Sequence, residues 1–236
     1  MNGKAFLKSY RCAAGALLLF AACNPIAVPK QYTPPDVPAF DAGSADDEVP
    51  GNRCPESPAY RFDNRYSPFF GGEEAVDVEV AQFSNFSCPH CADFASMTRD
   101  LWNRREDFRR RVRIYFHHYP FDYEIPWEQH RSAVAAANQG MDHFWEMHDF
   151  IYDGLDSGNQ YGKKTLFDFA EQNGLDRTRF EADYESEETI AFITWDRDQC
   201  LRTGASGTPS VFVCGEPINW SLLESEVDRL LYGDSR

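Results

Sequence analysis

Two cysteines separated by a proline and a histidine most constrain what this chain can fold into. They stand at Cys88 and Cys91, after an alternating apolar and acidic stretch at residues 76–80 that predicts a strand continuing to Phe83. From Cys91 to Phe108, apolar residues recur at near-helical spacing, which predicts a helix that opens at the cysteine pair. Such a pair is a metal clamp, a structural disulfide or a redox centre.

The start of a helix favours the redox centre. Unpaired backbone N–H groups and the positive end of the helix dipole would face the Cys88 sulfur. A free thiol with a pKa of about 8.5 is mostly protonated at pH 7, and a lower pKa makes the thiolate the major form. A protonated His90 would add positive charge, and Pro89 has no N–H to leave unpaired. A stabilised thiolate favours the reduced pair, so the Cys88–Cys91 disulfide becomes easy to donate.

The surrounding sequence disfavours a metal or haem site. Zinc would need two more ligands, but there is no second CxxC, and Cys200 and Cys214 are not closely spaced. Covalent haem attachment needs a histidine directly after the second cysteine, where Ala92 stands. His117 and His118 follow a predicted strand and are interpreted as loop histidines without a ligand role. We expect neither a metal nor another cofactor.

The N-terminus predicts export. Basic residues precede an apolar run at residues 13–22, which is too short to span a membrane as a helix but is typical of a signal-peptide core. Small residues before Cys23 resemble a bacterial lipobox, with Phe20 in place of the usual leucine. We expect residues 1–22 to be a signal peptide and Cys23 to carry lipid, with Asn24 favouring the outer membrane. The alternatives are an ordinary signal peptide, giving a periplasmic or secreted protein, and an uncleaved anchor.

The rest of the chain divides into a tether and a domain. Residues 23–53 are rich in proline, aspartate and alanine and lack periodic apolar positions, which predicts a disordered, lipid-anchored linker. Residues 54–236 are long enough for one ordinary domain. A net charge of −15 argues against a nucleic-acid partner. No segment is suited to dimerisation, so we expect a monomer.

The pattern after the cysteine pair resembles a known family. The strand, FSNFSCPHC, the opening helix, a long helical stretch and Gly207-Thr208-Pro209 are similar to the DsbA-like branch of the thioredoxin superfamily, over about residues 68–233. The resemblance implies an α/β thioredoxin fold with a helical insertion at about residues 118–203, between the second core strand and the strand after Pro209. It also implies that Cys88 is the exposed nucleophile and Cys91 its buried partner.

The resemblance extends to the substrate site. Pro209 would be a cis-proline facing the cysteine pair, and the backbone of Thr208 would pair with an extended substrate. A cis bond is uncommon even before proline, so this expectation is specific. One position departs from the family pattern, because Asn85 stands where relatives often carry aspartate. A carboxylate proton relay at that position is therefore in doubt.

These features predict an extracytoplasmic thiol-disulfide oxidoreductase that donates disulfides to exported, cysteine-containing proteins. A membrane partner or a small oxidant would reoxidise the pair to its disulfide. One alternative is a tethered reductase or isomerase that uses the same atoms. Another is a non-catalytic module that grips an extended peptide at Thr208 and Pro209.

Three further cysteines remain in the predicted domain. We expect a structural disulfide between Cys200 and Cys214, which flank the Gly-Thr-Pro loop, tying the helix at residues 187–201 to the strand at residues 210–213. Pairings that use Cys54 stay open.

Overall fold

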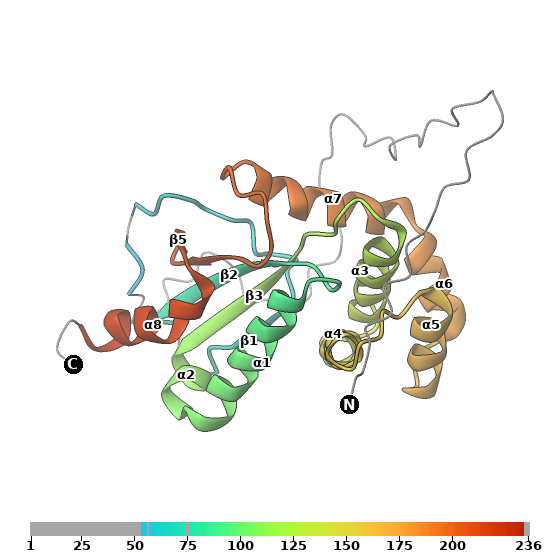
Figure 1. The fold of residues 1–236 in the computed structure, drawn as a ribbon, viewed down its shortest axis with the longest axis horizontal. Helices are drawn as coiled ribbons and strands as arrows, with labels where there is room; N and C mark the ends of the chain where they lie inside the picture. Colours follow the sequence, from blue (N-terminus) through green and yellow to red (C-terminus); the bar gives the residue numbers. More distant parts are fainter. Residues whose placement is uncertain (1–52, 56, 74–75, 234–236) are drawn as a thin grey trace, which may run out of the picture.

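The computed structural model describes residues 53–55, 57–73 and 76–233. The predicted signal peptide, Cys23 and the tether up to residue 52 lie outside the described residues. The described part forms one five-stranded sheet, in the order β1-β3-β2-β4-β5, surrounded by helices (Figure 1). The strands are β1 (Phe69–Gly71), β2 (Val78–Ser84), β3 (Val112–His118), β4 (Ser210–Val213) and β5 (Glu216–Ile218).

The two central strands, β2 and β3, run parallel, and all other neighbours in the sheet are antiparallel. A parallel pair needs a crossover, which α1 (Pro89–Arg104) and α2 (Glu106–Arg111) provide. Because α1 starts directly after β2, the cysteine pair lies where the central strand ends. The sequence analysis missed β1, whose three residues are too few to show an alternating pattern.

Five helices lie between β3 and β4, inside the predicted insertion at residues 118–203. Figure 1 shows α3 to α6 gathered at one end of the molecule and α8 at the other. The expected α/β fold with a helical insertion is confirmed. The remaining elements are α3 (Glu124–Ala137), α4 (Met141–Asp156), α5 (Lys163–Gln172), α6 (Arg177–Glu185), α7 (Glu187–Leu201), the 3-10 helix η1 (Trp220–Leu222) and α8 (Leu223–Tyr232).

The sheet buries both of its faces, as expected of central parallel strands with cover on each side. Val78 and Val80 of β2 face one cluster, which includes Phe94 of α1 and Val227 of α8. Phe83, which points the other way, belongs to a second cluster beneath α7. A third cluster packs the start of α1 against the insertion helices. None of the helices in the described residues is long and apolar enough to cross a membrane.

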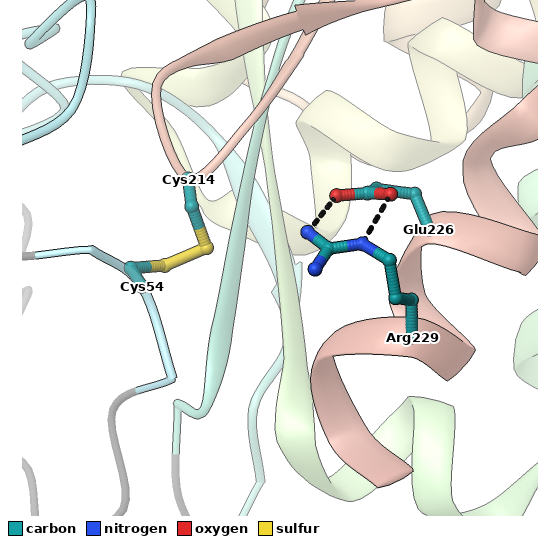
Figure 2. Close-up of a disulfide and its surroundings, with 4 residues drawn as sticks. All are labelled: Cys54, Cys214, Glu226 and Arg229. Atoms are coloured by element: carbon teal, nitrogen blue, oxygen red, sulfur yellow. Dashed lines mark hydrogen bonds and ion pairs between the residues drawn. A yellow bond between two sulfur atoms is a disulfide. The ribbon is translucent and has the colours of Figure 1, made fainter. Parts of the chain in front are cut away.

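The structure contradicts the expected Cys200–Cys214 disulfide. Cys214 is bonded to Cys54 instead, with a Cα–Cα distance of 5.0 Å (Figure 2). Cys200 is a free, buried cysteine.

Cys214 pairs with Cys54 and not with Cys200 because of the turn after β4. Cys214 has a left-handed φ of 51° and lies in the cluster of Val211 and Val213. Cys200 packs in the other cluster, with Phe212. Cys200 and Cys214 therefore belong to opposite faces of the sheet, and among the described cysteines it is Cys54 that reaches Cys214.

Candidate active site

Cys88 and Cys91 occupy the first turn of α1. Cys88 is the N-cap residue, with extended backbone angles (φ −101°, ψ 117°), and Pro89 fills the first helical position. A proline suits this position because its missing N–H would be unpaired there anyway. Both cysteines are free thiols. Cys88 is 7% exposed and Cys91 only 1%.

Cys88 was expected to be exposed, and this is wrong, because Cys88 is buried, although less completely than Cys91. The loop before β4 lies against it, and the Cys88 thiol donates a hydrogen bond to the Thr208 carbonyl oxygen at 3.3 Å. The Thr208–Pro209 peptide bond is cis, as the sequence predicted. The structure thus brings Cys88, Thr208 and Pro209 together across 120 residues of sequence.

The two thiols differ strongly in proton affinity. The pKa of Cys88 is lowered to about 5, first by a hydrogen bond from Cys91 and then by contacts with Thr208 and with the backbone N–H groups of Cys91 and His90, against the opposing effect of burial. The pKa of Cys91 is raised well above its ordinary value, mainly by burial and then by Cys88. At neutral pH the reduced pair therefore holds a thiolate at Cys88 and a thiol at Cys91.

We expect Cys88 in the reduced protein to half-titrate near pH 5, about 4 pH units below the ordinary value of 9.0. A depressed pKa in the folded state contributes stability that is fully present above the ordinary pKa and is lost as the pH falls through about 5. The reduced protein should therefore lose stability relative to the oxidised protein between pH 9 and pH 5. Thiolate absorbance and the pH dependence of Cys88 alkylation both measure the midpoint. A midpoint near pH 8 to 9 would show that the pKa of Cys88 is not lowered and would contradict this expectation.

His90 lies at the surface beside the pair. Its Nδ1 is 3.4 Å from Asp93 Oδ2, and its ring centroid is 6.3 Å from that of Trp220. The contact through which His90 lowers the pKa of Cys88 is made by its backbone N–H, whereas the sequence analysis had invoked its imidazole charge. Trp220 was not singled out from the sequence, because its closeness to His90 depends on how α1 and η1 meet. Asp93 was also not singled out, although it follows His90 by three residues in α1, a spacing that brings side chains together on a helix.

Asn85, which stands where relatives often carry aspartate, is buried. Its backbone N–H donates to Cys91 Sγ at 3.4 Å, and its side-chain oxygen accepts from the Ser87 N–H at 3.2 Å. The Ser87 hydroxyl in turn donates to Gln129 of α3 at 2.8 Å, which joins the cysteine turn to the insertion. The residue whose backbone contacts Cys91 thus carries a carboxamide, which cannot take up a proton as a carboxylate does.

Tyr152 of α4 is a neighbour of the pair that sequence analysis missed. It is 2% exposed and shares a buried cluster with Cys91 and Phe86. Burial raises its pKa well above the ordinary value, and its electrostatic interaction with the cysteine pair raises the pKa further. No local motif marks Tyr152, because it comes close to the pair only when α4 packs against α1.

His117 and His118 were interpreted as loop histidines, and this is wrong. Both belong to β3 and are fully buried. They point to opposite faces of the sheet, as residues in adjacent strand positions must. His117 Nδ1 lies 2.8 Å from Asp196 Oδ1, and His118 Nδ1 lies 2.8 Å from His130 Nδ1. Within the described ranges, no group of three or more His, Cys, Asp or Glu side chains is placed to hold a metal ion.

Comparison with known proteins agrees with this fold. A thioredoxin family model matches residues 64–232. A thioredoxin-like oxidoreductase from Silicibacter pomeroyi DSS-3 is 25% identical, with a TM-score of 0.57, over 69% of this chain and 91% of that chain. Oxidised BdbD from Bacillus subtilis has the same fold, with a TM-score of 0.61 at 18% identity, over 76% of this chain and 100% of that chain.

Curated relatives of two kinds match the sequence. The Na(+)/H(+) antiporter NhaA of Herminiimonas arsenicoxydans is 30% identical over 70% of this chain, but the match covers only 25% of that protein. A probable disulfide bond formation protein D of Bacillus anthracis is 24% identical over 68% of this chain and 76% of that protein. The chain thus spans about a quarter of the antiporter. The chain belongs to the thioredoxin family, and it shares its fold with the DsbA-like protein BdbD.

Proposed function

We propose that this chain donates its Cys88–Cys91 disulfide to exported proteins that carry cysteines. The opposite shifts in thiol pKa carry this proposal, with Cys88 lowered to about 5 and Cys91 raised. A pair whose reduced form is stabilised by a thiolate gives up its disulfide readily, because the reduced state is the favoured product. The same thiolate is a good leaving group when a mixed disulfide at Cys88 is resolved.

The proposed reaction has two exchange steps. A substrate thiolate attacks Cys88 Sγ, a substrate–Cys88 bond forms, and the Cys88–Cys91 bond breaks. The electron pair goes to Cys91, which takes up a proton because its pKa is high. A second substrate thiolate then attacks the substrate sulfur of the mixed disulfide, and Cys88 leaves as a thiolate. The substrate has lost two electrons, and the pair has gained them.

The neighbours of the pair have roles in this proposal. An extended substrate would pair with the backbone of Thr208 beside Pro209, which places its sulfur next to Cys88. Pro89 would hold the turn, and His90 would supply a backbone donor and a surface imidazole near the reacting sulfur. A membrane protein or a small oxidant would take the two electrons and restore the disulfide. No nucleic acid or bound cofactor has a part in these steps.

We place this reaction outside the cytoplasm. Residues 1–22 would direct export, and Cys23 would carry a lipid that anchors the protein facing the periplasm, with the outer membrane favoured. Residues 23–53 would tether a monomeric domain formed by residues 54–236. The sequence pattern supports these assignments.

A transfer assay tests the direction of the reaction. The oxidised protein is mixed in equal amounts with a reduced, unfolded protein that has two cysteines, and disulfides are counted by mass after rapid alkylation. We expect the disulfide to move to the substrate nearly completely. In a parallel assay the reduced protein should reduce insulin poorly. Fast insulin reduction with little transfer would identify a reductase, and stable peptide binding without exchange would identify a binding module.

A further inference from the structure

A cavity lies apart from the cysteine pair. It has a volume of about 250 Å³ and lies among the segment before β1, the end of β3, and helices α3, α6 and α7. Figure 1 shows α3 and α6 at the end of the molecule away from α8, with α7 running along the top of the view from that end toward the sheet. No residue from the cysteine turn or the Gly-Thr-Pro loop lines it.

The cavity walls are mainly apolar. Tyr66, Val134 and Phe192 line it, and the rings of Tyr66 and Phe192 both pack against Trp195. A cavity of roughly 150 Å³ with apolar walls holds one benzene ring. The present volume therefore leaves room for one aromatic ring and a short side chain.

His118 gives the wall an unsatisfied polar group. The residue is fully buried and lines the cavity, and its Nε2 has no hydrogen-bond partner among the described residues. Its Nδ1 lies 2.8 Å from the Nδ1 of His130, so one of these two atoms must carry a hydrogen and the other must accept it. When His118 Nδ1 donates, its Nε2 is left as a free acceptor.

Asp183 gives the wall a second acceptor. Its Oδ2 is buried and accepts no hydrogen bond in the described structure. The nearest cation, the Arg179 guanidinium, has its Nε 3.7 Å away and donates instead to the carbonyl oxygen of Asn138. Burial raises the pKa of Asp183, against the opposing effects of the Arg179 charge and of a hydrogen bond with the Asn138 side chain, so the buried Oδ2 is left to accept from a ligand.

The charges around the cavity select a cation. Asp183 and Glu188 are the ionisable acids in the wall, and no lysine or arginine lines it. Burial lowers the pKa of His118 to about 4, so this ring is neutral at pH 7 and contributes no positive charge that would attract an anion. The whole chain carries a net charge of −15, which also attracts cations.

We propose that this cavity is a second binding site, which takes a small primary amine with an apolar body about the size of one aromatic ring. The apolar body fills the space between Tyr66, Val134 and Phe192. The ammonium group donates to the acceptors in the wall, foremost the Asp183 carboxylate. Such charge-assisted hydrogen bonds are the strong ones, so the charge of the ligand decides its affinity.

Calorimetric titration of the full chain with three matched probes tests this. The probes are 2-phenylethylamine, 2-phenylethanol and 3-phenylpropionate, which share the ring and differ in charge. We expect the amine to bind at least about tenfold tighter than the alcohol, and the carboxylate not to bind. Amide NMR shifts caused by the amine should concentrate in α3, α6 and α7 and spare the turn at Cys88.

Variants assign the effect to the cavity. Asp183→Asn keeps the side-chain shape and should weaken amine binding about tenfold or more, while Glu181→Gln, an exposed acid on the same helix, should not change it. Ala137→Leu should fill the space and abolish binding of both amine and alcohol. Equal binding of all three probes, no binding of any, shifts centred on Cys88, or unchanged affinity in Asp183→Asn would each overturn the proposal. Exchange activity is not used as a readout, so the proposed redox function succeeds or fails separately.

Discussion

Replacing Cys88 by serine is expected to abolish disulfide transfer, with a loss on the order of 10³-fold or more. A serine hydroxyl cannot form the mixed disulfide, and Cys91 cannot take over, because it is 1% exposed and its pKa is raised. Transfer to a reduced two-cysteine substrate measures the loss. Cys91→Ser should also fail to transfer a disulfide, because Cys88 then has no partner with which to form one. Mixed with a protein that already carries a disulfide, this variant should instead accumulate a mixed disulfide, because the Cys88 thiolate can attack that disulfide and no Cys91 thiol is present to displace it.

Cys200→Ser is the matched control for this loss. Cys200 is also buried and free, but its pKa is raised to about 11, mainly by burial, so it stays a thiol at neutral pH. It packs beneath the opposite face of the sheet from α1. We expect this variant to transfer disulfides within about twofold of the unsubstituted protein. Substantial transfer by Cys88→Ser, or a comparable loss in Cys200→Ser, would show that the reacting sulfur has been misassigned.

Removal of the Cys54–Cys214 disulfide should have the largest effect on stability. The bond joins residues 160 apart in sequence, and closing a loop of this length restricts the unfolded chain strongly. It also holds the segment before β1 on the sheet, where the Tyr60 N–H donates to the Gly215 carbonyl oxygen at 3.1 Å. We expect Cys214→Ala to lower the free energy of unfolding by about 2 to 5 kcal/mol.

Urea denaturation with the Cys88–Cys91 pair held in one redox state measures this change. Cys54→Ala and the double variant with Cys214→Ala should lose the same amount as the single variant, because either substitution removes the same bond. Disulfide transfer by the folded variants should persist, since the bond joins neither cysteine of the pair. A change below about 0.5 kcal/mol, or clearly additive losses, would show that the disulfide does not hold the fold in solution.

Local patterns were enough to predict much of the fold. The helix expected at residues 187–201 matches α7, and the strand expected before the cysteine pair overlaps β2. Both depend on periodicity within one segment, which can be seen without knowing what packs against it. The cis bond before Pro209 was expected from the family resemblance, and the structure has it.

The predictions that were wrong, and the site neighbour that was missed, depend on contacts between segments distant in sequence. The partner of Cys214 is decided by the face to which its left-handed turn directs the sulfur, and sequence spacing carries no such information. The burial of His117 and His118 depends on the cover that α3 and α7 supply to β3, through His130 and Asp196. Tyr152 near Cys91 is a product of helix packing in the same way.

The reduction potential of the Cys88–Cys91 pair tests the central claim most directly. The protein is equilibrated with glutathione buffers of graded ratio, and the oxidised fraction is read by alkylation and mass. If the reduced pair is stabilised by a Cys88 thiolate, the potential should lie well above the glutathione range of about −220 to −260 mV. A potential within or below that range would contradict a disulfide donor, because electrons would then flow from the pair to its substrates.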